Sequence, residues 1–302
     1  MENTEKLLSE QALKQVSTME AIRIENNLSK IYELKTFKVD GKEILELSLD
    51  NVARVEAMIQ MDSNYTMSGN VDAIPSKRTN GTFYKGSTAY WMTQLKRIIS
   101  GEKTIECTIA KDGEVKQKIM GWEEVAIETI SAIDRENSTH LNVANGRQVF
   151  FENLTTVYMF GNLELLLRSP QYKAKEYIIN LLNPSVRVNV TKNKKNYSYE
   201  RRSYSFTTKF CHYACYYLFE GKPEQDNFSI YDDILSKSVG TYAQHYDIDN
   251  MPHKRNDFQN YATYSKIIDN IRVKAAAQTG YLISRNGFDH LLWYYHKGHS
   301  IK

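Results

Sequence analysis

The fold is organised around residues 203–239, which read SYSFTTKFCHYACYYLFEGKPEQDNFSIYDDILSKSV. From Phe210 to Phe219 only His212 is clearly polar. A helix that is apolar on nearly every side belongs in the interior of a domain. The pattern therefore predicts a buried helix over 206–220, around which the neighbouring elements pack.

Two charged residues flank this predicted helix and the loop after it. Lys209 lies at the start of the helix, and Thr207 and Thr208 are placed to cap its unsatisfied N–H groups. Asp232 follows a polar loop and opens a second predicted helix at 232–240. The sequence thus predicts a lysine and an aspartate at two helix N-termini.

The lengths of the two segments allow Lys209 and Asp232 to meet. A helix over 209–220 would run about 18 Å. The loop at 221–229 could cover roughly 30 Å when extended. The return path is therefore long enough to bring Asp232 beside Lys209.

Such a pair suits chemistry at the anomeric carbon of a sugar. Burial and the positive end of a helix dipole both disfavour a protonated lysine, and a neutral amine is a nucleophile. An aspartate held by N–H groups supplies a fixed negative charge, which stabilises the oxocarbenium-like sugar formed when an N-glycosidic bond breaks. The pair would fit excision of a base that is flipped out of a duplex.

Each residue also has an ordinary explanation. An aspartate at an N-cap is most often only a cap, and a lysine at a helix start is usually a solvated end. The residues alone leave two interpretations open for Lys209 and Asp232, a catalytic role and an ordinary structural one.

The same stretch resembles the signature of the helix-hairpin-helix DNA glycosylase superfamily. The resemblance is carried by TTKFCHYACYYLF at 207–219 and FSIYD at 228–232. This chain's version of the signature, with SFTTK at 205–209 and IYD at 230–232, is most similar to that of bacterial 8-oxoguanine-glycosylase-like proteins, some of which are associated with anti-phage defence. The resemblance covers about 35 residues well and the C-terminal half of the chain loosely.

The resemblance implies an enzyme that removes a damaged or modified base and leaves an abasic site. Lys209 takes the place of the family's nucleophilic lysine, which would add strand-nicking lyase activity, and Asp232 takes the place of its essential aspartate. Asp233 is the less favoured acid, since the Ile-Tyr-Asp approach points to the first one. The family's glycine-rich phosphate-binding turn is missing, because the matching residues 202–206 read RSYSF. Without a four-cysteine cluster, no iron–sulfur cofactor is expected, nor any other cofactor or metal.

A basic, aromatic stretch directly precedes the predicted helix. Residues 187–206 hold six basic side chains and one acidic one, with Tyr197, Tyr199, Tyr204 and Phe206 among them. Cations neutralise phosphates and aromatic rings stack on bases, although a solvated loop has the same composition. We expect double-stranded DNA as the partner. The expected DNA- or base-binding residues are Tyr84, Trp91, Lys194, Lys195, Arg201, Arg202, Tyr204, Phe206, Thr208 and His212.

Overall composition is that of an ordinary globular protein. The 302 residues carry a net charge of +3, too balanced to identify a nucleic-acid binder by itself. Three cysteines, two of them within one predicted helix, argue against a disulfide framework and for a reducing compartment. No apolar run is long enough to span a membrane, and the first residues lack a signal-peptide core, so we expect a cytoplasmic protein.

The remaining pattern predicts a mainly α (α+β) fold, with a helical glycosylase-like core and N-terminal helices and β-hairpins. A boundary near residue 150 would separate an N-terminal α+β region, 1–150, from a helical catalytic region, 151–302. No linker marks it, so both halves can share one core. The expected helices are 3–35, 50–61, 88–100, 122–133, 154–167, 174–182, 258–276 and 287–296; hairpins are expected within 37–49, within 104–120 and at 145–146, and loops at 64–86, 185–203 and 247–257.

Two other function classes remain open. A DNA-binding defence or sensor module without catalysis would need the same basic surface. A metal-dependent nuclease is suggested only by Glu114-Val-Lys116, in a predicted hairpin turn. Zinc or thiol chemistry at Cys211, His212 and Cys215 is less favoured than packing, because these helical positions point in different directions.

Overall fold

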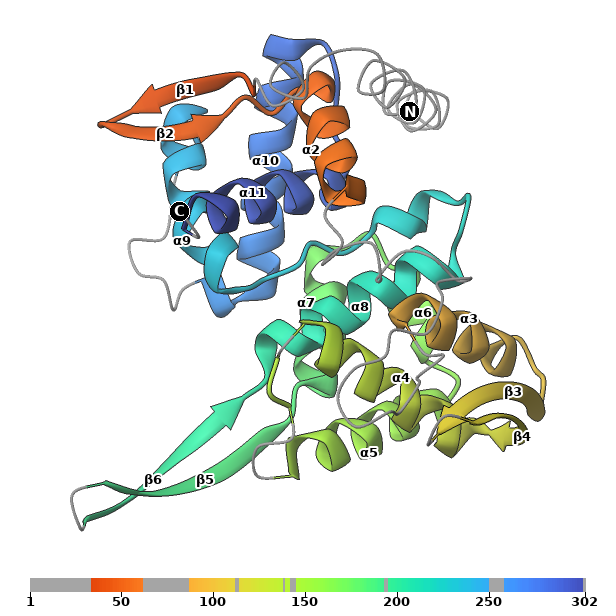
Figure 1. Ribbon diagram of the computed structural model, residues 1–302. Helices are drawn as coiled ribbons and strands as arrows, with labels where there is room; N and C mark the ends of the chain where they lie inside the picture. Colours follow the sequence, from red (N-terminus) through yellow and green to blue (C-terminus); the bar gives the residue numbers. More distant parts are fainter. Residues whose placement is uncertain are drawn as a thin grey trace. The chain divides into compact units, whose positions relative to one another are not determined.

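The computed structural model describes residues 34–61, 87–111, 114–137, 139–141, 145–192, 195–249 and 258–300 (Figure 1). Within these residues the chain is mainly helical and has three two-stranded antiparallel hairpins, which confirms the expected mainly α (α+β) class. The chain forms two compact units. The first unit combines Met1–Thr66 with Phe228–Lys302, and the second unit is Met67–Asn227.

The first unit joins the beginning of the chain to its end. The turn of its hairpin lies at Asp40 and Gly41, which both have positive φ, as the Asp-Gly pair predicts. Helix α11 packs against α2, α9 and α10, and the hairpin packs on α9, where the Tyr242 hydroxyl accepts a hydrogen bond from Leu45 N at 3.0 Å. Its elements are β1 (Thr36–Val39), β2 (Lys42–Leu45), α2 (Leu49–Met61), α9 (Asp233–His245), α10 (Tyr261–Thr279) and α11 (Arg285–Ser300).

The second unit is built around α8, as its apolar sequence predicts. Helix α8 packs against α3, α4, α6, α7 and the 3₁₀ helix η3. The ring of Phe150 meets those of Phe206 and Phe210 edge-on, with centroids 4.8 Å and 5.1 Å apart. Its elements are α3 (Thr88–Ile99), β3 (Thr104–Lys111), β4 (Glu114–Gly121), α4 (Trp122–Asn137), α5 (Gly146–Met159), α6 (Leu163–Arg168), α7 (Tyr172–Leu182), β5 (Ser185–Lys192), β6 (Lys195–Arg202), α8 (Tyr204–Leu218) and η3 (Pro223–Asp226).

The prediction of a loop at 185–203 is wrong. These residues form the β5–β6 hairpin, paired from Ser185 opposite Arg202 to Lys192 opposite Lys195. The alternation of Val186 and Val188 with polar residues is a strand signal, and both valines are buried on the second unit. The basic, polar composition of this stretch favours a loop, whereas its period-two alternation is that of a strand.

The predicted hairpin at Asn145-Gly146 is also wrong, since α5 begins there. Asn145 takes the left-handed conformation at φ 64° and is the N-cap of α5, a conformation that asparagine tolerates better than most residues. The single helix expected at 154–167 is two helices, because the chain turns at Gly161 with φ 69°. Residue 150, near which a boundary was expected, lies inside α5 and inside the second unit.

Other expectations are confirmed within a few residues, namely the helices near 50–61, 88–100, 122–133, 174–182, 258–276 and 287–296 and the hairpins near 37–49 and 104–120. Residues 3–33 of the helix predicted at 3–35 and the predicted loop at 64–86 lie outside the described residues, while residues 34 and 35 are not helical.

Candidate active site

Lys209 is buried on α8 but does not open it. Helix α8 begins at Tyr204 with Ser203 as N-cap, so Lys209 is its sixth residue. That places it about 8 Å along the axis from Tyr204, past the first turn, where the field of the helix dipole fades. The expectation of a lysine at the helix N-terminus is therefore wrong, while its burial, with 8% of its surface exposed, is confirmed.

The two threonines before Lys209 do not cap free N–H groups. The Thr207 hydroxyl donates to Ser203 O at 3.1 Å, and the Thr208 hydroxyl donates to Ser205 O at 3.0 Å. Both side chains thus bond back to carbonyls of the preceding turn, as Thr does within helices. Their expected role as caps is wrong because the helix starts earlier than predicted.

Asp232 is the N-cap of α9, as predicted. Its backbone is extended at φ −143°, and Oδ1 accepts a hydrogen bond from Leu235 N at 2.9 Å. Only 7% of the residue is exposed. Asp233, by contrast, lies on the surface and pairs with Lys237 at 2.6 Å. The geometry thus separates a buried, fixed carboxylate from an exposed, salt-bridged one.

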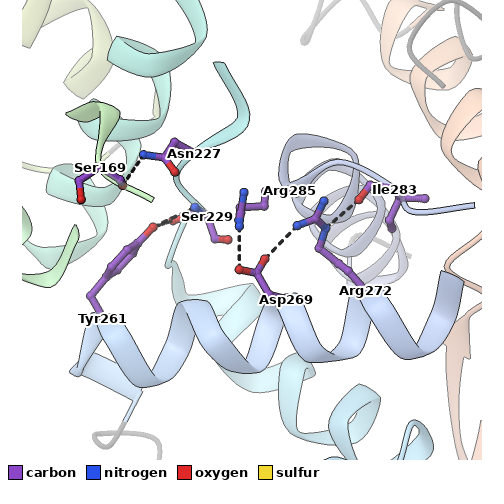
Figure 2. A network of polar contacts seen from close by, with 8 residues as sticks. All are labelled: Ser169, Asn227, Ser229, Tyr261, Asp269, Arg272, Ile283 and Arg285. Atoms are coloured by element: carbon purple, nitrogen blue, oxygen red, sulfur yellow. Dashed lines mark hydrogen bonds and ion pairs between the residues drawn. The ribbon is translucent and has the colours of Figure 1, made fainter. Parts of the chain in front are cut away.

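The segment that leads into Asp232 is held by tyrosines of α10. The Tyr261 hydroxyl accepts from Ser229 N at 2.9 Å and donates to Ser229 O at 3.0 Å (Figure 2). The Tyr264 hydroxyl donates to Ile230 O at 2.7 Å. Extended backbone without a strand partner leaves its polar groups to be satisfied elsewhere. Here the hydroxyls of Tyr261 and Tyr264 satisfy the backbone groups of Ser229 and Ile230, which lie three and two positions before Asp232.

Aromatic contacts strengthen the same attachment. The Phe228 ring stacks on Tyr261 with centroids 5.7 Å apart, and the Tyr231 ring meets Tyr264 edge-on at 5.3 Å. Each residue of 228–231 is therefore tied to α10 by a ring or by its backbone. We call residues 228–231 together with Asp232 the strap.

Helix α10 is itself locked to the following loop and to α11. Asp269 bridges two arginines, with Oδ1 at 2.9 Å from Arg272 and Oδ2 at 2.7 Å from Arg285 (Figure 2). Arg272 also donates through Nε to Ile283 O at 2.7 Å. Separating the partners of a buried ion pair is costly. Because a shift of α10 against α11 would separate Asp269 from Arg285, this triad holds α10 in one position.

The residue before the strap is anchored within the second unit. Asn227 donates through Nδ2 to Leu167 O at 2.6 Å and to Ser169 O at 2.9 Å. Figure 2 shows the amide directed at Ser169. The backbone is thus tied down on either side of the peptide bond at which the chain passes from one unit to the other.

The expected base-binding residues of the second unit are largely interior. Phe206 and Trp91 are core residues, so their rings have no access to a base in this structure. Tyr204, Thr208 and His212 are buried on α8, where the His212 ring lies against those of Tyr213 and Tyr216.

The expected phosphate-binding residues lie on the β5–β6 hairpin. Arg201 donates to His140 O at 3.2 Å, while Arg202 is exposed and lies 3.9 Å from Glu200. Tyr84 and Lys194, and the side chain of Lys195, fall outside the described residues.

The α8 cysteines behave as packing residues. Burial raises the pKa of the Cys211 thiol and that of the Cys215 thiol well above the usual range for cysteine. Across the part of the chain that the structure describes, no group of three or more His, Cys, Asp or Glu residues could hold a metal ion.

Comparisons with family models, curated proteins and solved structures find no match. Among the described residues, no helix is long and apolar enough to cross a membrane. Lys209 belongs to the second unit and Asp232 to the first, so the expected approach of the two stays a prediction.

Tyr261 and Tyr264 are the site residues that the sequence did not reveal. They follow the N-cap Asn260 and stand three positions apart, so they share a helix face. This spacing is the sequence signal that identifies Tyr261 and Tyr264 as a pair on one helix face. It gives no indication that the face meets the strap, which lies about 30 positions earlier in the chain.

Proposed function

We propose that the protein is a DNA glycosylase that flips a damaged or modified base out of a duplex and cleaves its N-glycosidic bond. The observation that carries the proposal is the construction around Asp232. A buried carboxylate is fixed by Leu235 N–H, and the backbone leading to it is clamped by Tyr261 and Tyr264. Such immobility is what electrostatic stabilisation of a transition state requires.

Asp232 would act on the sugar. As the C1′–N bond breaks, positive charge develops on the deoxyribose ring, and a fixed negative charge nearby lowers the energy of that state. In a hydrolytic reaction, the base leaves with the bonding electron pair and takes up a proton, while water adds to C1′ and loses one. An ordinary helix cap needs no second level of support, whereas the strap is held at each residue before Asp232.

Lys209 is the proposed amine for a lyase branch. Its Nζ would bond to C1′ as the base leaves, and loss of a proton from nitrogen with ring opening would give a Schiff base. Lys209 is buried on α8, which keeps its side chain largely out of bulk water. Both 8-oxoguanine and a phage-modified base are compatible substrates.

The proposal is tested on duplexes that each carry one damaged or modified base. Incubation followed by alkali should reveal abasic sites on at least one duplex. Asp232→Asn, which keeps an N-cap side chain, should lower the excision rate at least 100-fold. Asp233→Asn removes an equal charge from the exposed neighbour and should leave the rate within about twofold. The absence of abasic sites on every substrate would contradict the proposal, and magnesium-dependent strand cutting would favour a nuclease.

Borohydride trapping tests the lyase branch separately. The wild-type protein should form a covalent complex with an excised duplex, and Lys209→Ala should not. Lys222→Ala, on an exposed lysine of the same unit, is the matched control and should still be trapped. A complex that persists in Lys209→Ala would remove the role assigned to Lys209.

A further inference from the structure

Strand β4 lies at the open edge of the β3–β4 hairpin. Its residues 115–119 are all exposed, and among the described strands it pairs only with β3. The other strand of the hairpin, β3, lies beside α3 (Figure 1). A strand edge with unpaired backbone groups can add a further strand by hydrogen bonding. The edge of β4 is therefore a place where another chain can dock.

The outer edge of β3 is engaged by α3. The Tyr90 hydroxyl accepts a hydrogen bond from Thr108 N at 2.8 Å. Thr108 N therefore points away from β4, although Thr108 lies directly opposite Gln117 in the register. Hydrogen-bonded and non-hydrogen-bonded pairs alternate along an antiparallel ladder. The N–H and C=O groups of Val115, Gln117 and Ile119 consequently point away from β3, toward the open edge.

The side chains at the same three positions form an exposed, largely apolar face. Val115 is 60% exposed and Ile119 is 62% exposed, with the exposed Gln117 between them. Side chains two positions apart share one face of a strand. The opposite face of the hairpin is buried in the unit through Ile105 and Cys107. Strand β4 thus offers unpaired backbone groups and apolar side chains along one edge.

The order of these residues suits pairing with a second copy of the same strand. Val115 and Ile119 lie two positions to either side of Gln117. In an antiparallel pair with a twofold axis at Gln117, Val115 of each copy meets the partner's Ile119. Pairs of β-branched residues directly opposite each other stabilise antiparallel sheets. The three outward-pointing residues of each copy would exchange about six backbone hydrogen bonds.

We infer that the protein forms a twofold dimer in which β4 pairs with β4 of a second copy, giving a four-stranded sheet in the order β3–β4–β4–β3. The interface is isologous, since both copies use the same surface. Growth stops at two copies, because the outer edge of β3 lies against α3 in each of them. The inference goes beyond the proposed function and does not depend on base excision.

Two lysines on the same edge offer a different explanation. Lys116 and Lys118 are exposed, and lysines on edge strands prevent pairing with other chains. In the inferred dimer, Lys116 of each copy faces the partner's Lys118. Because Lys118 is bound to Glu124 at 2.7 Å, a carboxylate accompanies each of these lysine pairs. A protective edge predicts a monomer at every concentration, and the experiments below separate the two explanations.

The mass of the whole chain in solution tests the dimer. In sedimentation experiments, the mass should rise with concentration from that of one chain to that of two. Val115→Lys alters both Val–Ile pairs of the symmetric interface and should raise the dissociation constant of the dimer about tenfold or more. Val273→Lys is the matched control, since Val273 is 59% exposed on α10, and it should leave the constant within about twofold. Thermal melts check that each variant folds.

Cross-linking tests the register. The two copies of Gln117 would lie at the axis with their Cα atoms about 5.5 Å apart, within the range that a disulfide spans. Gln117→Cys should therefore form a covalent dimer when treated with oxidised glutathione. Glu106→Cys, on the exposed face of β3 opposite Ile119, is the control and should remain a single chain on a non-reducing gel. The native cysteines are buried in both variants.

The mass of one chain at every concentration would overturn the inference, as would a dimer whose dissociation constant Val115→Lys leaves unchanged. Equal cross-linking of Gln117→Cys and Glu106→Cys would overturn the register. A mass that continues to rise beyond that of two chains would overturn the closed twofold arrangement.

Discussion

Removing the Tyr261 hydroxyl tests whether the strap is held as the structure indicates. Tyr261→Phe keeps the ring that stacks on Phe228 and deletes both hydrogen bonds to Ser229. Each buried backbone group left without a partner costs about 1–3 kcal/mol. Two such groups together should cost about 2–6 kcal/mol, so the strap should open more readily than in the wild-type protein.

Hydrogen exchange of the Ser229 amide reports this opening directly, because its N–H donates to Tyr261. A loss of about 2 kcal/mol would speed its exchange roughly thirtyfold, since 1.4 kcal/mol is a factor of ten. Tyr264→Phe deletes one hydrogen bond, to Ile230 O, and should cost about half as much. Tyr281→Phe, at an exposed tyrosine of the same unit, should change stability by less than about 0.5 kcal/mol. If Tyr261→Phe behaves like Tyr281→Phe, the hydroxyl does not hold the strap and the reasoning is refuted.

Two further predictions concern the second unit. Burial raises the pKa of Glu136 above its ordinary 4.5, partly offset by hydrogen bonds from Thr88 N, so the folded state binds its proton more tightly than the unfolded state. Its contribution to stability therefore falls as pH rises above about 4.5. In urea denaturation from pH 4 to pH 7, the free energy of unfolding of Glu136→Gln should increase relative to that of the wild type as pH rises. A difference that does not change with pH would refute the burial effect on Glu136. Cys107, Cys211 and Cys215 are free and buried. Ellman's reagent should find no fast-reacting thiol in the native protein and three in denaturant, while a fast-reacting native thiol would contradict their burial.

Local patterns were sufficient for the parts of the site that depend on neighbouring residues. The N-cap role of Asp232 depends on the helix that starts immediately after it, and the predicted start was correct. The burial of α8 followed from its apolar sequence. The sequence places Lys209 at the start of a helix, whereas α8 begins two residues before the predicted 206, with the buried Tyr204 as its first residue.

Contacts between distant residues could not be predicted in the same way. The bond between Tyr261 and Ser229 joins residues 32 positions apart, and a tyrosine sequence does not specify which backbone group its hydroxyl will meet. The β5–β6 hairpin differs from this case, because its local signal, the alternation of Val186 and Val188 with polar residues, lies in a stretch whose high charge is typical of a loop. The alternation of apolar and polar residues determines the structure of that stretch.

Asp232 is proposed to serve base excision, and the release of free base tests this role most directly. A duplex on which abasic sites form is incubated with excess protein, and the released base is quantified by mass spectrometry over time. The wild-type protein and Asp233→Asn should release base at rates within about twofold of each other, while Asp232→Asn should be at least 100-fold slower with unchanged affinity for the duplex. Release of base by Asp232→Asn at the wild-type rate would contradict the claim.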